Sequence, residues 1–197
     1  AGLPSGPGSG RHVPARYSES WLALQEALGG RYVLEAVLGE GGMGIVYLAR
    51  ERVLDRLVAL KILPPALANP GRRERFLREA RVAARLKHDN IVPIHAVDEA
   101  GPFVYYTMDY IRGRTLAQRL HDGALPVAEV TRILRDVARA VHCVHEQGII
   151  HRDLKPNNIL IERDTGRAYV ADFGLARVLT ESPLAGAGRT FGTFAYI

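Results

Sequence analysis

Hydrophobic residues in the first part of the chain fall into five short runs. These runs are YVLEAVL from Tyr32, IVYLARE from Ile45, LVALKIL from Leu57, IVPIHAVDE from Ile91 and FVYYTMDYI from Phe103. Short runs rich in β-branched, aliphatic and aromatic residues are typical of β-strands. The pattern therefore predicts five strands, of which the first three form a small antiparallel sheet.

The remaining apolar positions have the spacing of helices. Residues 72–87 (RRERFLREARVAARLK) place Phe76, Ala80 and Ala83 on one side, with arginines around the rest. After the last predicted strand the pattern stays helical, first in LAQRLHD and then in a long run over 127–147. The sequence therefore predicts an α+β fold with a β-rich lobe that contains one helix, followed by an α-rich lobe.

These changes of pattern divide the chain into four segments. Residues 1–17 are rich in glycine, proline and serine and predict a disordered arm. Residues 18–30 predict a short helix and linker, whose apolar face packs against either the first lobe or another domain. The first lobe covers 31–111, and a partial second lobe covers 112–197.

Composition and charge exclude several classes of protein. Hydrophobic residues make up 47% of the chain and charged residues 24%, as in ordinary globular proteins. The net charge of +5 comes from scattered arginines, which solvated helix faces explain better than a nucleic-acid surface. No apolar run approaches the roughly 18 residues of a membrane span, and the sequence shows no secretory signal. We expect no nucleic-acid partner, no membrane segment in this chain and a cytoplasmic location.

Cys143 is the only cysteine, so the chain cannot form an internal disulfide and a reducing compartment is expected. His142 and His145 lie beside it in the helical run, and His151 follows. No carboxylate or cysteine pair completes a set of four zinc ligands around these histidines. The sequence therefore favours a packing role for Cys143 and no zinc site.

Glycines between the first two predicted strands suggest a phosphate-binding turn. Gly39, Gly41 and Gly44 form G-x-G-x-x-G, a spacing that also occurs in dinucleotide-binding folds and in ordinary turns. In dinucleotide-binding folds the glycines lead from a strand into a helix, but here they lead into the strand IVYLA. The context favours a hairpin whose backbone N–H groups cover phosphates.

The segment IHRDLKPNNILIERDTGRAYVADFGL, residues 150–175, carries the strongest motifs. With LGEGGMGIVYLAR at 38–50 and VALK at 58–61, it resembles the eukaryotic-type (Hanks-type) serine/threonine protein kinase family in its bacterial style. The resemblance implies the two-lobed protein-kinase-like fold. The family pattern would run on into A-P-E after GTFAYI, so we expect a chain truncated before that element.

The resemblance assigns roles to five polar residues. Asp153 would accept the proton of the attacking hydroxyl, and Lys155, typical of serine/threonine kinases, would neutralise charge on the moving phosphoryl group. Asn158 and Asp172 would hold Mg²⁺. Lys61 of VALK would contact the ATP phosphates.

Lys61 also needs a carboxylate to hold its geometry. Glu79 in the helix at 72–87 matches the family position, and Glu74, five residues earlier, is the competitor on another face. Glu79 is therefore expected to be the partner. Ala83, four residues after Glu79, departs from the bulkier residue of many relatives, and this substitution predicts a loosely held helix.

The same resemblance predicts the ATP site. The gatekeeper is Met108 and the hinge is 109–111. The expected binding residues are Leu38, Gly39, Glu40, Gly41, Gly42, Met43, Gly44, Val46, Ala59, Lys61, Met108, Asp109, Ile111 and Leu160.

The implied reaction transfers the γ-phosphoryl group of Mg-ATP to Ser or Thr of a protein substrate. The alternative is an ATP-binding regulatory or inactive kinase-like module, and a small-molecule phosphotransferase is less favoured because GT-x-x-Y is present at 192–196. Autophosphorylation is expected at Thr190, with Thr180 and Ser182 as lesser candidates. A phosphate there would pair with Arg152 and switch activity.

Overall fold

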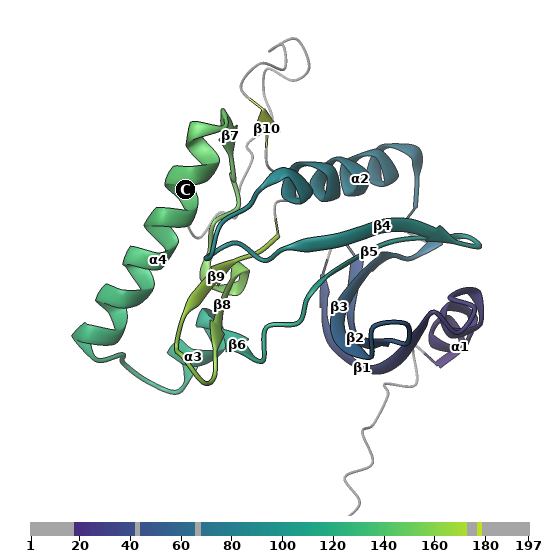
Figure 1. Cartoon of the computed structure of the whole chain (residues 1–197), viewed down its shortest axis with the longest axis horizontal. Helices are drawn as coiled ribbons and strands as arrows, with labels where there is room; N and C mark the ends of the chain where they lie inside the picture. The colour runs from purple at the N-terminus through teal and green to yellow at the C-terminus, as the bar shows by residue number, and fades with distance from the viewer. Residues whose placement is uncertain (1–17, 42–43, 66–67, 173–176, 179–197) are drawn as a thin grey trace, which may run out of the picture.

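The computed structural model describes residues 18–41, 44–65, 68–172 and 177–178. The predicted arm at 1–17 and the three candidate phosphorylation sites lie outside these residues. The described chain forms a lobe built on a sheet and a second lobe with most of its helical residues in one long helix (Figure 1).

The first lobe is built on a five-stranded antiparallel sheet in the order β1-β2-β3-β5-β4. All five predicted strands are present. Their bounds are β1 Tyr32–Gly41, β2 Gly44–Glu51, β3 Arg56–Leu63, β4 Ile94–Ala100 and β5 Phe103–Asp109. The central strand β3 is almost wholly buried, and the following Pro64 cannot continue the ladder. This arrangement places Lys61 near the middle of the sheet.

Helix α1 (Ser18–Ala27) covers one face of the sheet. Leu24 and Leu28 are buried against β1, β2, β3 and β5, and Trp21 packs edge-on against Tyr47 with ring centroids 5.3 Å apart. The Gln25 side chain donates to the Tyr32 carbonyl at 2.9 Å and accepts from the Leu34 N–H at 2.8 Å. The sequence left two possible partners for the apolar face of α1, and in the structure this face packs against the first lobe.

Helix α2 (Pro70–Arg85) lies on the opposite face and begins two residues before the expected start. Asn69 caps the helix by accepting a hydrogen bond from the Arg72 N–H at 2.9 Å, and Pro70 supplies the first turn. The expected start was late because this Asn-Pro signal was not used. Phe76 and Ala80 pack on the sheet, whereas Ala83 is buried in the core of the second lobe.

The second lobe contains one long helix against a small sheet. Helix α4 (Val127–Glu146) buries Ile133, Val137, Ala140 and Val144 against β7, β8 and β9. The remaining elements are β6 Gly113–Thr115, α3 Leu116–His121, β7 Ile149–Ile150, the 3-10 turn η3 Pro156–Asn158, β8 Ile159–Glu162, β9 Ala168–Val170 and β10 Arg177–Val178. Strands β6, β8 and β9 form one sheet, and β7 pairs with β10. None of the helices in the described residues is long and apolar enough to cross a membrane.

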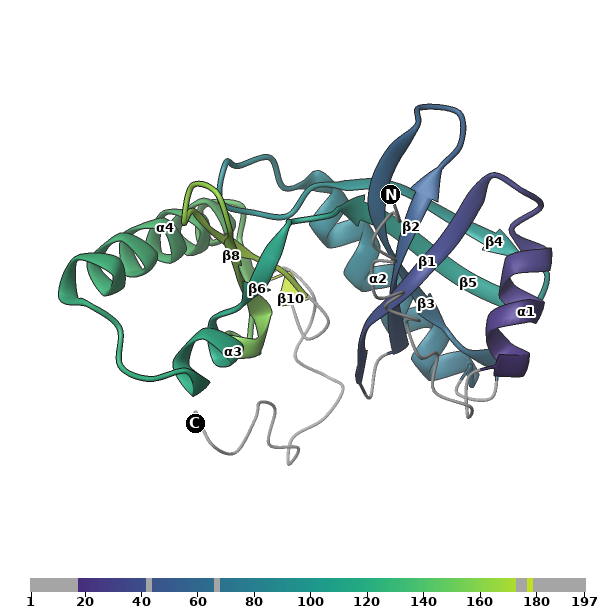
Figure 2. The same cartoon turned by 90° about the horizontal axis from the view of Figure 1, so that it is seen from below.

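The lobes are joined by the continuous chain and by hydrogen bonds from the segment before β4 (Figure 2). The chain passes directly from β5 to β6 through residues 110–112. On the other side, Asn90 receives the Val170 N–H on its carbonyl at 2.8 Å and donates its side-chain amide to the Ala168 carbonyl at 2.9 Å. The Val92 N–H then donates to the Val170 carbonyl at 3.1 Å. The segment before β4 is therefore fixed to β9, which leads directly to Asp172.

Candidate active site

A cavity of about 400 Å³ lies between the two lobes. The first lobe contributes β1 and β2 above it, the connection between the lobes forms its back, and β8 lies below. Eight of the residues predicted to bind ATP line this cavity: Leu38, Gly39, Val46, Ala59, Met108, Asp109, Ile111 and Leu160. Asn158 and Asp172 line the same cavity. The structure therefore brings the predicted adenine-binding and metal-binding residues to one place.

Two glycines at the edges of this region are required by the backbone. Gly44 has φ +128°, and a Cβ added to it would lie 2.0 Å from the Ile62 carbonyl oxygen. A Cβ on Gly113 would lie 1.9 Å from the Ile161 carbonyl oxygen. By contrast, Gly39 and Gly41 have open space where a Cβ would stand. Sheet packing therefore demands Gly44, whereas the space beside Gly39 and Gly41 remains available to a ligand.

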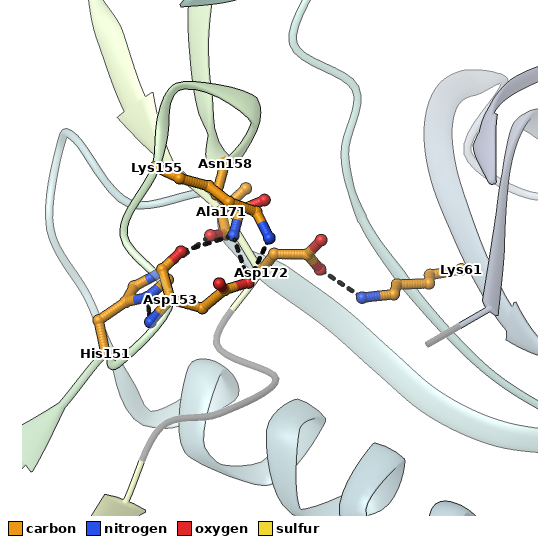
Figure 3. Close-up of polar contacts among 7 residues, drawn as sticks. All are labelled: Lys61, His151, Asp153, Lys155, Asn158, Ala171 and Asp172. Carbon is orange, nitrogen blue, oxygen red and sulfur yellow. Dashed lines mark hydrogen bonds and ion pairs between the residues drawn. The ribbon is translucent and has the colours of Figure 1, made fainter. Parts of the chain in front are cut away.

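Lys61 joins the two lobes. Its side chain is 4% exposed, and its Nζ forms an ion pair with a carboxylate oxygen of Asp172, whose side chain is 43% exposed (Figure 3). The ammonium group also lies 5.8 Å from the centre of the Tyr106 ring. A buried lysine needs such a partner because an unpaired charge is costly to remove from water.

Two predicted catalytic side chains, Asp153 and Lys155, lie in the loop between β7 and η3, and the predicted metal ligand Asn158 lies beside them at the end of η3 (Figure 3). Lys155 Nζ lies 2.8 Å from Oδ2 of Asp153. Asn158 Nδ2 donates to the Asp153 carbonyl at 2.8 Å and to its Oδ2 at 3.2 Å. Asp153 is 17% exposed along its side chain, so its carboxylate is held in place but remains accessible.

His151 supports this loop from within. It is 4% exposed; its Nε2 lies 3.1 Å from the Ala171 carbonyl, and its Nδ1 accepts the Asp153 N–H at 3.3 Å. Since a carbonyl requires a donor and an N–H requires an acceptor, these contacts assign a neutral ring with its proton on Nε2. Burial also lowers the pKa of His151. The ring therefore ties the Asp153 loop to the segment that carries Asp172.

The backbone at two of these positions is unusual. Arg152 has φ 63° and Asp172 has φ 64°, a region that non-glycine residues rarely adopt. The Ala171 N–H donates to the Asn158 carbonyl at 2.9 Å, immediately before Asp172. Backbone strain of this kind is concentrated at functional sites, where the surrounding contacts maintain it.

Some predicted residues cannot be placed in the site. Gly42 and Met43 lie outside the described residues, as does the side chain of Glu79, although its backbone belongs to α2. Glu74, the competing carboxylate, is 73% exposed and accepts a hydrogen bond from Arg78 at 3.3 Å. The pairing of Lys61 with Glu79 therefore stays a prediction.

Three residues that the sequence did not single out contribute to this region. Asn90 is 5% exposed and ties two lobes through the hydrogen bonds described above. Thr115 and Gln118 line the cavity and form a reciprocal cap at the start of α3. The T-x-x-Q spacing before an apolar run was a readable signal for this cap. Asn90 had no comparable signal because its partners are distant in the sequence.

Comparison with known families agrees with this geometry. The family described as "Protein kinase domain" matches residues 32–197. The chain belongs to the protein kinase domain family. The resemblance drawn from the glycine loop, VALK, HRDLKPNN and DFG is therefore confirmed. As a protein kinase domain, the chain is also similar to named bacterial kinases.

Two of these relatives illustrate the similarity. Serine/threonine-protein kinase PknJ of Mycobacterium tuberculosis is 40% identical over 169 residues, which are 84% of this chain and 29% of PknJ. Serine/threonine-protein kinase PrkC of Bacillus subtilis is 37% identical over 178 residues, 89% of this chain and 27% of PrkC. The chain thus spans less than a third of the length of these relatives.

Solved structures confirm the kinase fold. The kinase domain of PknI from M. tuberculosis, solved as a single mutant, is 38% identical with a TM-score of 0.62, covering 75% of this chain and 61% of that one. A double mutant of the same domain gives a TM-score of 0.65 at 37% identity, with 75% and 60% coverage. The predicted α+β, two-lobed protein-kinase-like fold is correct.

Proposed function

We propose that the protein transfers the γ-phosphoryl group of Mg-ATP to serine or threonine residues of protein substrates. The observation that carries this proposal is one connected group of polar side chains at the cavity between the lobes. Asn158 and Asp172 line the cavity, Lys61 forms an ion pair with Asp172, and Asp153 accepts hydrogen bonds from Asn158 and Lys155. Phosphoryl transfer needs positioning and charge neutralisation more than covalent help. These side chains are suited to both tasks.

The described residues fit a magnesium–nucleotide complex. Mg²⁺ is usually held by one or two carboxylates together with substrate phosphates. Asp172 and Asn158 supply one carboxylate and one amide oxygen to the cavity, and Lys61 supplies a nearby positive charge. When bound, Mg²⁺ would neutralise the phosphate oxygens. Phosphate oxygens of the nucleotide would supply further ligands.

Asp153 is the proposed proton acceptor. Its Oδ2 receives hydrogen bonds from Lys155 and Asn158, which orient the carboxylate toward an incoming hydroxyl. Because the Lys155 ammonium group lies beside the Asp153 carboxylate, it would also donate to the oxygens of the phosphoryl group during transfer. The neutral His151 keeps this loop in register with Asp172 without adding charge.

Relatives and chemistry support the finer parts of the proposal. The relatives named above are serine/threonine kinases, and Lys155 stands at the position that distinguishes this group. A need for ATP and a single cysteine favour the cytoplasm.

Autophosphorylation is proposed at Thr190, with Thr180 and Ser182 as alternatives. Arg152 would be the cation that pairs with the phosphate. Mass spectrometry beside Thr190→Ala kinetics tests this part: full activity with an unphosphorylated segment would contradict it.

A radiolabel assay tests the main proposal. It measures transfer of γ-phosphate from labelled ATP to a generic basic protein, with and without Mg²⁺. We expect Mg²⁺-dependent label on phosphoserine or phosphothreonine after acid hydrolysis. Binding of Mg-ATP without any transfer would instead indicate the alternative, a regulatory nucleotide-binding module. Label on tyrosine alone would contradict the assignment of the substrate.

A further inference from the structure

A second, basic cavity lies on α4, away from the cavity between the lobes, which we call the nucleotide cavity. It has a volume of about 250 Å³. We call it the arginine pocket, and its lining residues are Asp89, Asn90, Arg132, Arg135, Asp136, Arg139, Thr165 and Arg167. No described residue lines both this pocket and the nucleotide cavity. The proposed phosphoryl transfer therefore does not use it.

The arginines of the pocket come from two elements that pack together. Arg132, Arg135 and Arg139 are spaced at three and four residues along α4, so they share one face of the helix. Arg167 follows the turn between β8 and β9, the hairpin that lies beside α4 in Figure 1. Asn158 and Asp172 adjoin the other end of this hairpin. The pocket is therefore at the end of the hairpin remote from the catalytic loop.

Internal carboxylates balance only part of this charge. Asp136 is 4% exposed, and both of its carboxylate oxygens have partners. One accepts a hydrogen bond from Arg135 at 3.0 Å and the other accepts from the Ala168 N–H at 3.2 Å. Among the described residues, Arg132, Arg139 and Arg167 have no ion pair. The other carboxylate, Asp89, is exposed at the rim. Four arginines thus face two aspartates, and like charges at this spacing destabilise a helix unless an anion compensates them.

Arg132 has an unsatisfied hydrogen-bond donor beside this pocket. Its Nε is buried and has no hydrogen-bond partner. Its guanidinium is held against the hairpin turn, because a Cβ on Gly166 would lie 2.3 Å from Nη2. A buried donor without an acceptor is unfavourable, because it has lost its hydrogen bonds to water. A guanidinium fixed in this way is prepared to donate to an oxyanion.

We propose that the arginine pocket binds the phosphate group of a phosphorylated serine or threonine side chain in a protein segment. All of its cations are arginines, whose planar forks match phosphate oxygens bidentately. The volume is below the roughly 300–1,000 Å³ of pockets that enclose whole small molecules, which favours a group carried on a chain. The choice of phosphoserine or phosphothreonine rests on the proposed function, because that reaction would produce them.

Peptide binding tests this proposal independently of catalysis. The Asp153→Asn protein, which should not transfer phosphate, is titrated with a fluorescent phosphoserine peptide and with its unphosphorylated form. We expect the phosphorylated form to bind at least about tenfold more tightly. Arg132→Gln with Arg139→Gln should remove that preference. The matched control, Arg75→Gln with Arg81→Gln, removes the same charge from exposed arginines of α2 and should leave binding unchanged within about twofold.

A charge-conserving variant separates phosphate recognition from general attraction. Arg132→Lys with Arg139→Lys keeps both charges but removes both forks, and it should also lose most of the preference. If a double variant fails to fold by circular dichroism, Arg167→Gln in the exposed loop replaces it. The proposal would be overturned by equal binding of both peptides or by full preference in the lysine variant. Binding of an oligonucleotide or of inorganic phosphate by a protein that binds neither peptide would also overturn it. Failure of γ-phosphate transfer by the unmodified protein would instead contradict only the proposed function.

Discussion

Lys61 and Asp153 lie in different lobes and are held by different forces. Lys61 is on β3, where backbone pairs with Val46 on one side and Tyr106 on the other fix its position within a buried sheet. Asp153 lies in a loop and is fixed by side-chain hydrogen bonds from Lys155 and Asn158. The first lobe therefore positions chemistry through packing, whereas the second lobe does so through polar contacts. Substitution of buried apolar residues in the first lobe should accordingly lower stability most, whereas substitution of Asp153 in the second lobe should lower turnover most.

The largest effect is expected from Asp153→Asn. Loss of the proposed proton acceptor should lower the turnover number by about 10²–10⁴-fold. ATP affinity should stay within a few-fold, because Asp153 does not line the nucleotide cavity. The melting temperature should change little, since the amide keeps the shape of the side chain. Turnover near the wild-type rate would contradict the role of Asp153 as proton acceptor.

Packing in the first lobe should give the largest effect on stability. Leu60 is 0% exposed in the core between the sheet and α1, and Leu60→Ala should lower the free energy of unfolding by about 2–5 kcal/mol. Leu22, 69% exposed on α1, supplies the control: Leu22→Ala should stay within about 0.5 kcal/mol. Denaturant titration with and without saturating Mg-ATP measures both. Similar losses for the two variants would mean that α1 and the sheet do not pack as described.

The same contrast explains how much of the fold the sequence could predict. The five strands of the first lobe were predictable because each one coincides with a short run of residues typical of strands, and Pro64 follows the end of β3. Strands β7 and β10 have two residues each and therefore leave no periodic pattern. Their existence depends on pairing between Ile149 and Val178, which are far apart in the sequence.

The site was predictable for a different reason. Its motifs keep chemically distinctive residues at fixed short spacings, so Asp153, Lys155 and Asn158 could be named without any knowledge of their contacts. The contact of His151 with the Ala171 carbonyl and the hydrogen bond from Asn90 to β9 could not be named in this way. The first joins residues 20 positions apart in the sequence and the second joins residues 78 positions apart. The arginine pocket depends on the same kind of long-range contact, between α4 and the β8–β9 turn.

Gln25 offers a smaller test of how α1 is held on the first lobe. Its side chain makes two hydrogen bonds with β1, so Gln25→Ala should lower the free energy of unfolding by about 1–3 kcal/mol. Glu26→Ala on the same helix is the control, because Glu26 is exposed and has no side-chain partner among the described residues. Turnover at low temperature should be unchanged in both. A loss of turnover without a loss of stability in Gln25→Ala would contradict the separation between the lobes.

The smallest effect is expected from Tyr47→Phe, in the same core. The Tyr47 side chain is fully buried, and its hydroxyl has no hydrogen-bond partner among the described residues. Removing an unsatisfied polar atom should leave the free energy of unfolding unchanged or raise it by up to about 1 kcal/mol, while the ring keeps its contact with Trp21.

The pH dependence gives this variant a second measurement. Burial raises the pKa of Tyr47 above its ordinary value of 10.0. The unfolded chain therefore releases this proton at a lower pH than the folded protein does, and the tyrosine protein should lose stability as pH rises above about 10. Tyr47→Phe should lose less over that range, which denaturant titration at alkaline pH would reveal. A clear loss of stability at neutral pH would show that the hydroxyl has a partner, and that polar contacts contribute to the first lobe as they do to the second.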